Sequence, residues 1–155
     1  MKIAKLLMRD MVLLDLKCRE REDALREMVA FLKSKNRISR EKELYERLLQ
    51  RERLGSTAIG EGVAIPHCKL KGVKDPLVML AISREGVDFE SRDGQPSHLF
   101  FLVVSSPDKP SLNLQILAAI AHLVRKAEAL IKRVLSAGSI DVVLDIIVDE
   151  EAKLD

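Results

Sequence analysis

The residue of this sequence best suited to chemistry is His67, at the end of the glycine-rich stretch GSTAIGEGVAIPH. A neutral imidazole nitrogen is a nucleophile near neutral pH, because the unperturbed pKa of histidine is about 6.5. Glycine lets the main chain approach a ligand, and Pro66 stiffens the backbone just before the imidazole. The apolar residues Val63–Ile65 predict a short buried strand before the proline. The stretch therefore predicts a histidine that a partner molecule can reach.

Further side chains in the same region suit an anion. Arg51 lies sixteen residues before His67, and a guanidinium can hold two phosphate oxygens at once. On its predicted helix Arg51 continues an apolar row toward the domain body, although Glu52 extends a neighbouring row in the same way and a solvated helix end stays an alternative. Ser56 and Thr57 can offer hydroxyl or backbone N–H groups to an oxyanion, or they can serve only as turn residues. The glycine spacing fits neither a P-loop nor a dinucleotide loop.

The loop SSPDKPS, residues 105–111, is expected to form the other side of the site. It leaves a predicted buried strand and enters a helix, and crevices of α/β sheets bind ligands at such strand ends. A helix N-terminus presents unpaired N–H groups and a favourable dipole to phosphate. Ser111, at the start of this helix, is therefore a further candidate for phosphate binding.

The order of glycines, apolar strand, proline and His67 closely resembles the phosphorylation-site signature of the enzyme IIA proteins of the fructose, mannitol and nitrogen-regulatory branch of the bacterial phosphotransferase system. The resemblance covers almost the whole chain, is most specific over 51–67, and is nearest the nitrogen-regulatory type. It implies that the histidine accepts a phosphoryl group, on the ring nitrogen remote from the backbone, from a small histidine phosphocarrier protein. It also implies that Arg51 stabilises the phosphoryl group and that no metal or cofactor takes part.

One position departs from this family pattern. Aligning NLQILAAIA with the family's usual His-Leu-x-x-Leu run puts Asn113 where a second histidine normally stands. An asparagine can donate an amide hydrogen bond to the phosphorylated imidazole, but it carries neither a proton nor a charge. A helix-capping role is its alternative.

The resemblance leaves three functions to compare. The main one is a regulatory phosphoryl relay whose phosphorylation state alters contacts with target proteins. The first alternative is a fructose- or mannitol-specific component that passes the phosphoryl group to a IIB protein. The second, which Asn113 keeps open, is an interaction module whose histidine is not phosphorylated.

The composition excludes several other classes. The 26 basic and 24 acidic residues nearly cancel and are mixed along the chain, which argues against nucleic-acid binding. No apolar run reaches the roughly 18–20 residues of a membrane span. Cys18 and Cys68 are too few for a disulfide framework, and no signal peptide is evident, so a cytoplasmic protein is expected. His98 and His122 match no signature and are expected to be structural, and no zinc-ligand spacing occurs.

Hydrophobic periodicity predicts one domain over residues 1–155, which is compatible with a monomer or a homodimer. The expected fold is α/β: a three-layer α/β/α sandwich with a small mixed β-sheet, two helices before the strand-rich middle and three after it. Ser39 is a candidate N-cap of the second helix, which stops at Gly55. The predicted strands are 11–16, 63–65, 76–84, a fragment at 87–89, and 98–104, and the predicted helices are 23–35, 39 to about 54, 112–125, 127–136 and 139–148.

Overall fold

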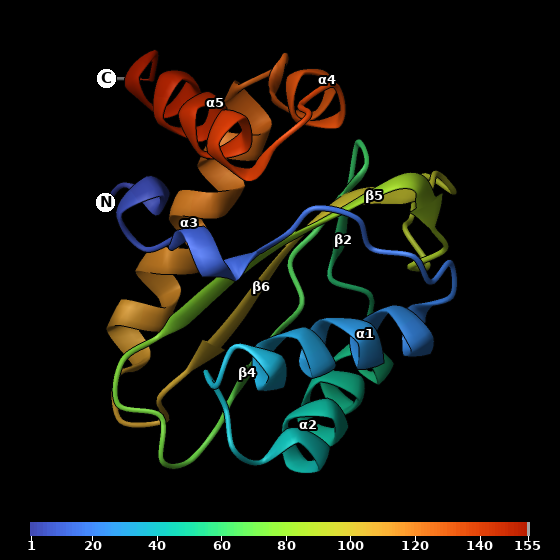
Figure 1. Cartoon of the computed structure of the whole chain (residues 1–155). Helices are drawn as coiled ribbons and strands as arrows, with labels where there is room; N and C mark the ends of the chain where they lie inside the picture. Colours follow the sequence, from blue (N-terminus) through green and yellow to red (C-terminus); the bar gives the residue numbers. More distant parts are fainter. Residues whose placement is uncertain (155) are drawn as a thin grey trace.

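A mixed β-sheet forms the middle layer of the computed structural model, which describes residues 1–154 (Figure 1). In that part of the chain, six strands and five α-helices form, with two 3₁₀ turns near the N-terminus. The strand order is β1–β5–β6–β3–β2, and β4 also pairs with β6. The elements are η1 (Ile3–Lys5), η2 (Arg9–Met11), β1 (Val12–Leu13), α1 (Arg21–Ser34), α2 (Glu41–Arg53), β2 (Ala58–Gly60), β3 (Val63–Ala64), β4 (His67–Lys69), β5 (Leu77–Val87), β6 (Ser97–Ser105), α3 (Pro110–Lys126), α4 (Leu130–Leu135) and α5 (Ile140–Ala152).

Strand β6 is the centre of the sheet. It runs antiparallel to β5 and parallel to β3 and β4, which lie one after the other along its second edge. Its apolar run is buried almost throughout, as expected of a strand covered on both faces. Phe100 packs edge-on against Phe89, with ring centroids 5.1 Å apart. The predicted strand 98–104 is therefore confirmed, and its burial follows from its central position.

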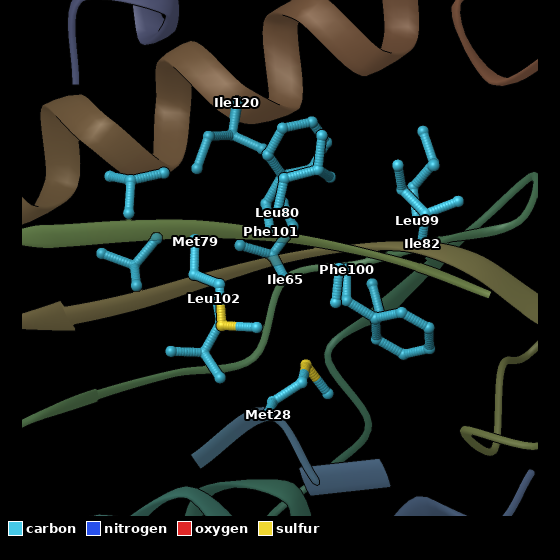
Figure 2. Close-up of a cluster of buried hydrophobic side chains, with 14 of the residues drawn as sticks. Met28, Ile65, Met79, Leu80, Ile82, Leu99, Phe100, Phe101, Leu102 and Ile120 are labelled. Atoms are coloured by element: carbon cyan, nitrogen blue, oxygen red, sulfur yellow. The ribbon is translucent and has the colours of Figure 1, made fainter. Parts of the chain in front are cut away.

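Helices cover both faces of this sheet. Helices α1 and α2 lie on one face, and α3, α4 and α5 lie on the other (Figure 1). Figure 2 shows the two sides of the core, with Met28 of α1 below the strands and Ile120 of α3 above them. Two helices precede the strand-rich middle and three follow it. The predicted three-layer α/β/α sandwich is confirmed.

The helices follow from their apolar spacing, but not every predicted cap forms. Helix α1 buries an apolar stripe at three- and four-residue intervals against the sheet. The prediction that Ser39 caps α2 is wrong, because Arg40 occupies the N-cap position and no side chain caps this helix end. Ser139 does cap α5, where its hydroxyl accepts a hydrogen bond from Val142 N–H.

The predicted strand at 63–65 is part of a longer interrupted edge. Strand β3 ends at Ala64, and β4 begins at His67, paired with Val103 of β6. Pro66 has no N–H for a strand hydrogen bond, but its carbonyl accepts Val103 N–H at 2.9 Å. His67 therefore lies on a strand beside the end of β6, rather than on a turn.

The two ends of the described chain meet on the face opposite α1 and α2 (Figure 1). The buried Glu151 carboxylate accepts the N–H groups of Ile3 and Ala4 at 2.7 and 2.8 Å. The N-terminal turn is thereby tied to α5. Among the helices of residues 1–154, none has the length and apolarity needed to cross a membrane.

Candidate functional site

His67 lines a cleft of about 500 Å³ at the C-terminal end of β6. Four elements enclose this cleft: the second half of α2, β4, the end of β6 and the first half of α3. This is the strand end at which the sequence predicted a crevice. The lining residues are Arg47, Gln50, Arg51, Leu54, His67, Cys68, Lys69, Val103, Ser105, Pro110, Asn113, Leu114 and Leu117.

The imidazole of His67 is half-buried and held in one orientation. Its Nδ1 lies 2.7 Å from the carbonyl oxygen of Ile65, and because a carbonyl can only accept, Nδ1 carries the proton. In the neutral ring Nε2 is then the unprotonated nitrogen. Burial lowers the pKa of His67, the hydrogen bond to Ile65 opposes this, and the charge of Arg51 lowers it further. The ring is therefore kept neutral, with Nε2 as its nucleophilic atom.

Arg51 lies on the α2 wall of the same cleft, so the structure brings together the two residues that the sequence pairs. Arg51 as a whole is half-buried, and its Nη1 donates to the carbonyl of Gly55 at 2.8 Å at the surface. Arg47 and Lys69 add two more positive charges, and no acidic residue is among those lining the cleft in residues 1–154. The cleft suits an anionic group. The next residue, Glu52, turns inward and is fully buried.

Ser56 and Thr57, the predicted phosphate ligands, are not among the residues that line this cleft. The hydroxyl of Ser56 donates to the carbonyl of Phe89 at 2.5 Å. Thr57 is buried, and both its N–H and its hydroxyl donate to the carboxylate of Glu52, at 2.9 and 2.5 Å. Their hydroxyl protons are committed within the protein, so both residues belong to the turn, the alternative that the sequence left open.

The start of α3 forms the opposite wall. Pro110 has no N–H and Asn113 N–H bonds to Lys109, which leaves the N–H groups of Ser111 and Leu112 without acceptors inside the helix. The side chain of Ser111 is exposed and is not among the lining residues. At this helix end the backbone N–H of Ser111, rather than its hydroxyl, is the group of the kind that binds anions.

Asn113 lines the cleft but is almost fully buried. Its amide nitrogen donates to the carbonyl of Ser106 at 3.0 Å, which ties the loop after β6 to the helix. Its oxygen is buried and meets no hydrogen-bond partner within residues 1–154. One amide hydrogen is thus used by the loop, and the second remains for a group in the cleft.

Two features of the site went unpredicted from the sequence. Leu54 and Leu114 line the cleft with 86% and 69% of their surface exposed, which creates an apolar rim on either side of it. Isolated exposed leucines carry no sequence signal, since only the fold brings them to one opening. Burial raises the pKa of the neighbouring Cys68 thiol to about 12. That thiol stays protonated and does not compete with His67 as a nucleophile.

Comparison with known proteins yields one family. The sequence model of "Phosphoenolpyruvate-dependent sugar phosphotransferase system, EIIA 2" matches residues 5–150. A PTS system fructose-specific EIIABC component of Bacillus subtilis is 37% identical over 147 residues, which are 95% of this chain but 23% of that protein. A nitrogen regulatory protein of Bradyrhizobium diazoefficiens is 40% identical over 128 residues, which are 81% of each chain.

A solved structure agrees with these sequence matches. The nitrogen regulatory protein IIA-Ntr of Neisseria meningitidis superposes with a TM-score of 0.84 and 28% identity, over 94% of this chain and 98% of that chain. The signature around His67, the layered fold and the match to the family model agree with one another. This chain belongs to the EIIA 2 family of the phosphoenolpyruvate-dependent sugar phosphotransferase system, and within that family it is similar to the nitrogen regulatory proteins.

Proposed function

We propose that this protein accepts a phosphoryl group on Nε2 of His67 from the phosphohistidine of a small carrier protein, and that its phosphorylation state regulates target proteins. The observation that carries the proposal is the hydrogen bond from Nδ1 of His67 to the Ile65 carbonyl. It leaves Nε2 as the nucleophile of a ring that shares a cleft with Arg51.

The transfer needs only groups that this chain and its donor supply. The lone pair of Nε2 forms a bond to phosphorus as the phosphorus–nitrogen bond of the donor breaks, and that electron pair stays on the donor nitrogen. The ring of His67 gains positive charge as the new bond forms, while Nδ1 keeps its proton. The bond from Nδ1–H to the Ile65 carbonyl then becomes charge-assisted and stronger.

Positive groups around the cleft stabilise the transferring oxygens. Arg51 uses one N–H on Gly55 and has others left for the phosphoryl group. Pro110 and Asn113 form the opposite wall, which brings the N-terminal end of α3, with its favourable dipole, to the cleft. Phosphoryl transfer depends mainly on such positioning and electrostatics.

The rim of the cleft suits protein partners. Leu54 and Leu114 offer apolar contacts on either side of the histidine, while Arg47 and Lys69 add positive charge. We expect the donor to cover these residues with apolar groups surrounded by acidic ones, because complementary charge speeds and orients encounter.

The decisive experiment is phosphorylation in a defined mixture. The protein is incubated with a phosphorylated histidine carrier, and label that is acid-labile and base-stable is expected on the unmodified protein. His67→Ala should carry none, and label that persists in it would refute the site. Absence of label on the unmodified protein with a competent cognate carrier would favour the interaction module.

A second candidate function is sugar-specific transfer to a IIB protein. It is supported by the 37% identity to the fructose-specific component of Bacillus subtilis over 95% of this chain. The labelled protein would be mixed with a fructose- or mannitol-type IIB domain. Rapid loss of label to that domain favours sugar transfer, and retention of the label favours the regulatory function.

A further inference from the structure

Glu52 is a buried carboxylate that the phosphoryl transfer described above does not use. It stands in the last turn of α2, 1% exposed, directly after Arg51. Within residues 1–154 no salt bridge reaches it, and both of its oxygens are occupied by Thr57, one by the N–H at 2.9 Å and one by the hydroxyl at 2.5 Å. Burying a carboxylate is unfavourable unless hydrogen bonds compensate it. The two bonds to Thr57 therefore compensate the cost of burying Glu52, and they fix its carboxylate inside the protein, as an exposed side chain would not be fixed.

A continuous series of hydrogen bonds connects this carboxylate to His67. Thr57 is held to Glu52 by both its N–H and its hydroxyl, and its carbonyl accepts the N–H of Ile65 at 3.0 Å. The carbonyl of Ile65 in turn accepts the Nδ1–H of His67 at 2.7 Å. Glu52 is thus linked to the imidazole through hydrogen bonds and the backbones of two residues, Thr57 and Ile65.

Glu52 also bounds the turn that holds Arg51, through its backbone carbonyl at one end and its carboxylate at the other. The N–H of Gly55 donates to the carbonyl of Glu52 at 3.1 Å, and the side-chain bonds to Thr57 close the far end of the turn. Between these two anchors lies the Gly55 carbonyl, which accepts the guanidinium of Arg51 at 2.8 Å. Glu52 and Thr57 are therefore connected both to Arg51, the cation, and to His67, the nucleophile.

We propose that Glu52 and Thr57 are positioning residues that hold Arg51 and His67 in register for phosphoryl transfer. The inference rests on the function proposed above and names residues that do not touch the phosphoryl group. Displacement of a reacting group by about 1 Å can slow an enzyme about a hundredfold, so a pair that sets two of them at once has a large effect on rate.

The test compares two hydroxyl deletions in the same turn. Thr57→Val removes the hydroxyl bond to Glu52 at nearly constant shape. Ser56→Ala removes the bonds of its hydroxyl to the Phe89 carbonyl and from the Ala58 N–H, and neither bond involves Glu52, Arg51 or His67. Thr57→Ser and Glu52→Gln keep hydrogen bonds between the two side chains. Each variant is assayed with a phosphorylated carrier over a range of carrier concentrations, and its thermal unfolding is followed by circular dichroism.

We expect Thr57→Val to lower the rate at saturating carrier about tenfold or more, with the KM for the carrier changed by less than about twofold. Ser56→Ala, Thr57→Ser and Glu52→Gln should stay within about threefold of the unmodified rate. A Thr57→Val protein that is folded and as fast as Ser56→Ala would overturn the proposal, and so would a loss of about tenfold in Thr57→Ser, which keeps the hydroxyl.

A second measurement separates this proposal from the transfer itself. The ¹⁵N chemical shifts of the His67 ring report which nitrogen carries the proton, whether or not the protein is ever phosphorylated. The unmodified protein and Ser56→Ala should show a single tautomer protonated at Nδ1, and Thr57→Val a mixture. An unchanged tautomer in Thr57→Val refutes the positioning role. If the unmodified protein takes no label but Thr57→Val does change the tautomer of His67, only the proposed phosphoryl transfer is refuted.

Discussion

His67 and His98 are held by the protein in nearly the same way, yet only one stands in a reactive setting. Each ring is half-buried, and each Nδ1 donates to a backbone carbonyl, that of Ile65 at 2.7 Å or that of Ser83 at 2.8 Å. The His98 ring packs over Gly86, where an added Cβ would lie 3.1 Å from the ring. His67 opens instead into the cleft that contains Arg51.

Under the proposed function, a fixed tautomer is not enough to make a histidine a phosphoryl acceptor. Both rings satisfy that condition, and the surrounding charge and open space distinguish them. Around His67 the cleft supplies a guanidinium, the start of α3 and an apolar rim. Each prediction below changes one of these differences.

The largest expected effect comes from removing the cation. Arg51→Gln should lower the rate of phosphorylation about 100- to 1000-fold, the range for removing one preorganised charge-stabilising group. Arg53→Gln is the matched control, since Arg53 is exposed two residues further along and does not line the cleft. Equal rates in the two variants would mean that Arg51 does not stabilise the phosphoryl group. Rates are measured in a single turnover with phosphorylated carrier.

A negative charge on the opposite wall should have the next largest effect. Asn113→Asp keeps the side-chain shape but sets a carboxylate against the incoming phosphoryl oxygens, and we expect the rate to fall about tenfold. Gln115→Glu adds the same charge to an exposed position of α3 outside the cleft lining. If both variants slow the reaction alike, the effect arises from net charge on the donor's approach and not from the cleft.

A smaller effect is expected on the titration of the His67 ring and on the pH dependence of the free energy of unfolding. Burial and then the charge of Arg51 lower the pKa of His67, so the ring should titrate below 6.5 in an NMR titration. In Arg51→Gln the midpoint should rise, but remain below 6.5 because burial is the larger cause. Because the pKa of His67 is lower in the folded protein, the unfolded chain binds the imidazole proton at a higher pH than the folded one does. The free energy of unfolding should therefore decrease as the pH falls through 6.5. A midpoint above 6.5 would contradict the neutral nucleophile.

The smallest effect on transfer is expected from the second histidine. His98→Ala leaves the Ser83 carbonyl without this partner, and it should lower the free energy of unfolding by about 1–3 kcal/mol. The phosphorylation rate of the folded variant should stay within about twofold. Urea unfolding and the transfer assay measure the two quantities. A large loss of rate with little loss of stability would place His98 in the reaction and remove the contrast with His67.

The helices and long strands were predictable because their burial patterns are local. The stripe of α1 and the apolar run of β6 each repeat within one segment, and the register of β5 and β6 needs only two such runs. Strand β4 was missed because its three residues form a strand only by pairing with Val103–Ser105 of β6. No pattern within so short a segment can reveal a partner that lies more than thirty residues away.

The sequence by itself predicted His67 as the nucleophile and Arg51 as the cation, because the apolar strand, Pro66, His67 and Arg51 stand at the spacings of the enzyme IIA signature that this stretch resembles. The tertiary structure supplied the hydrogen bond that leaves Nε2 of His67 free, and it alone decided where the donors of Ser56 and Thr57 point. Those directions follow from the burial of Glu52 and from the backbone carbonyls of Ile65 and Phe89. A hydrogen-bond donor takes whichever acceptor the folded chain brings within reach, and sequence spacing does not specify that acceptor.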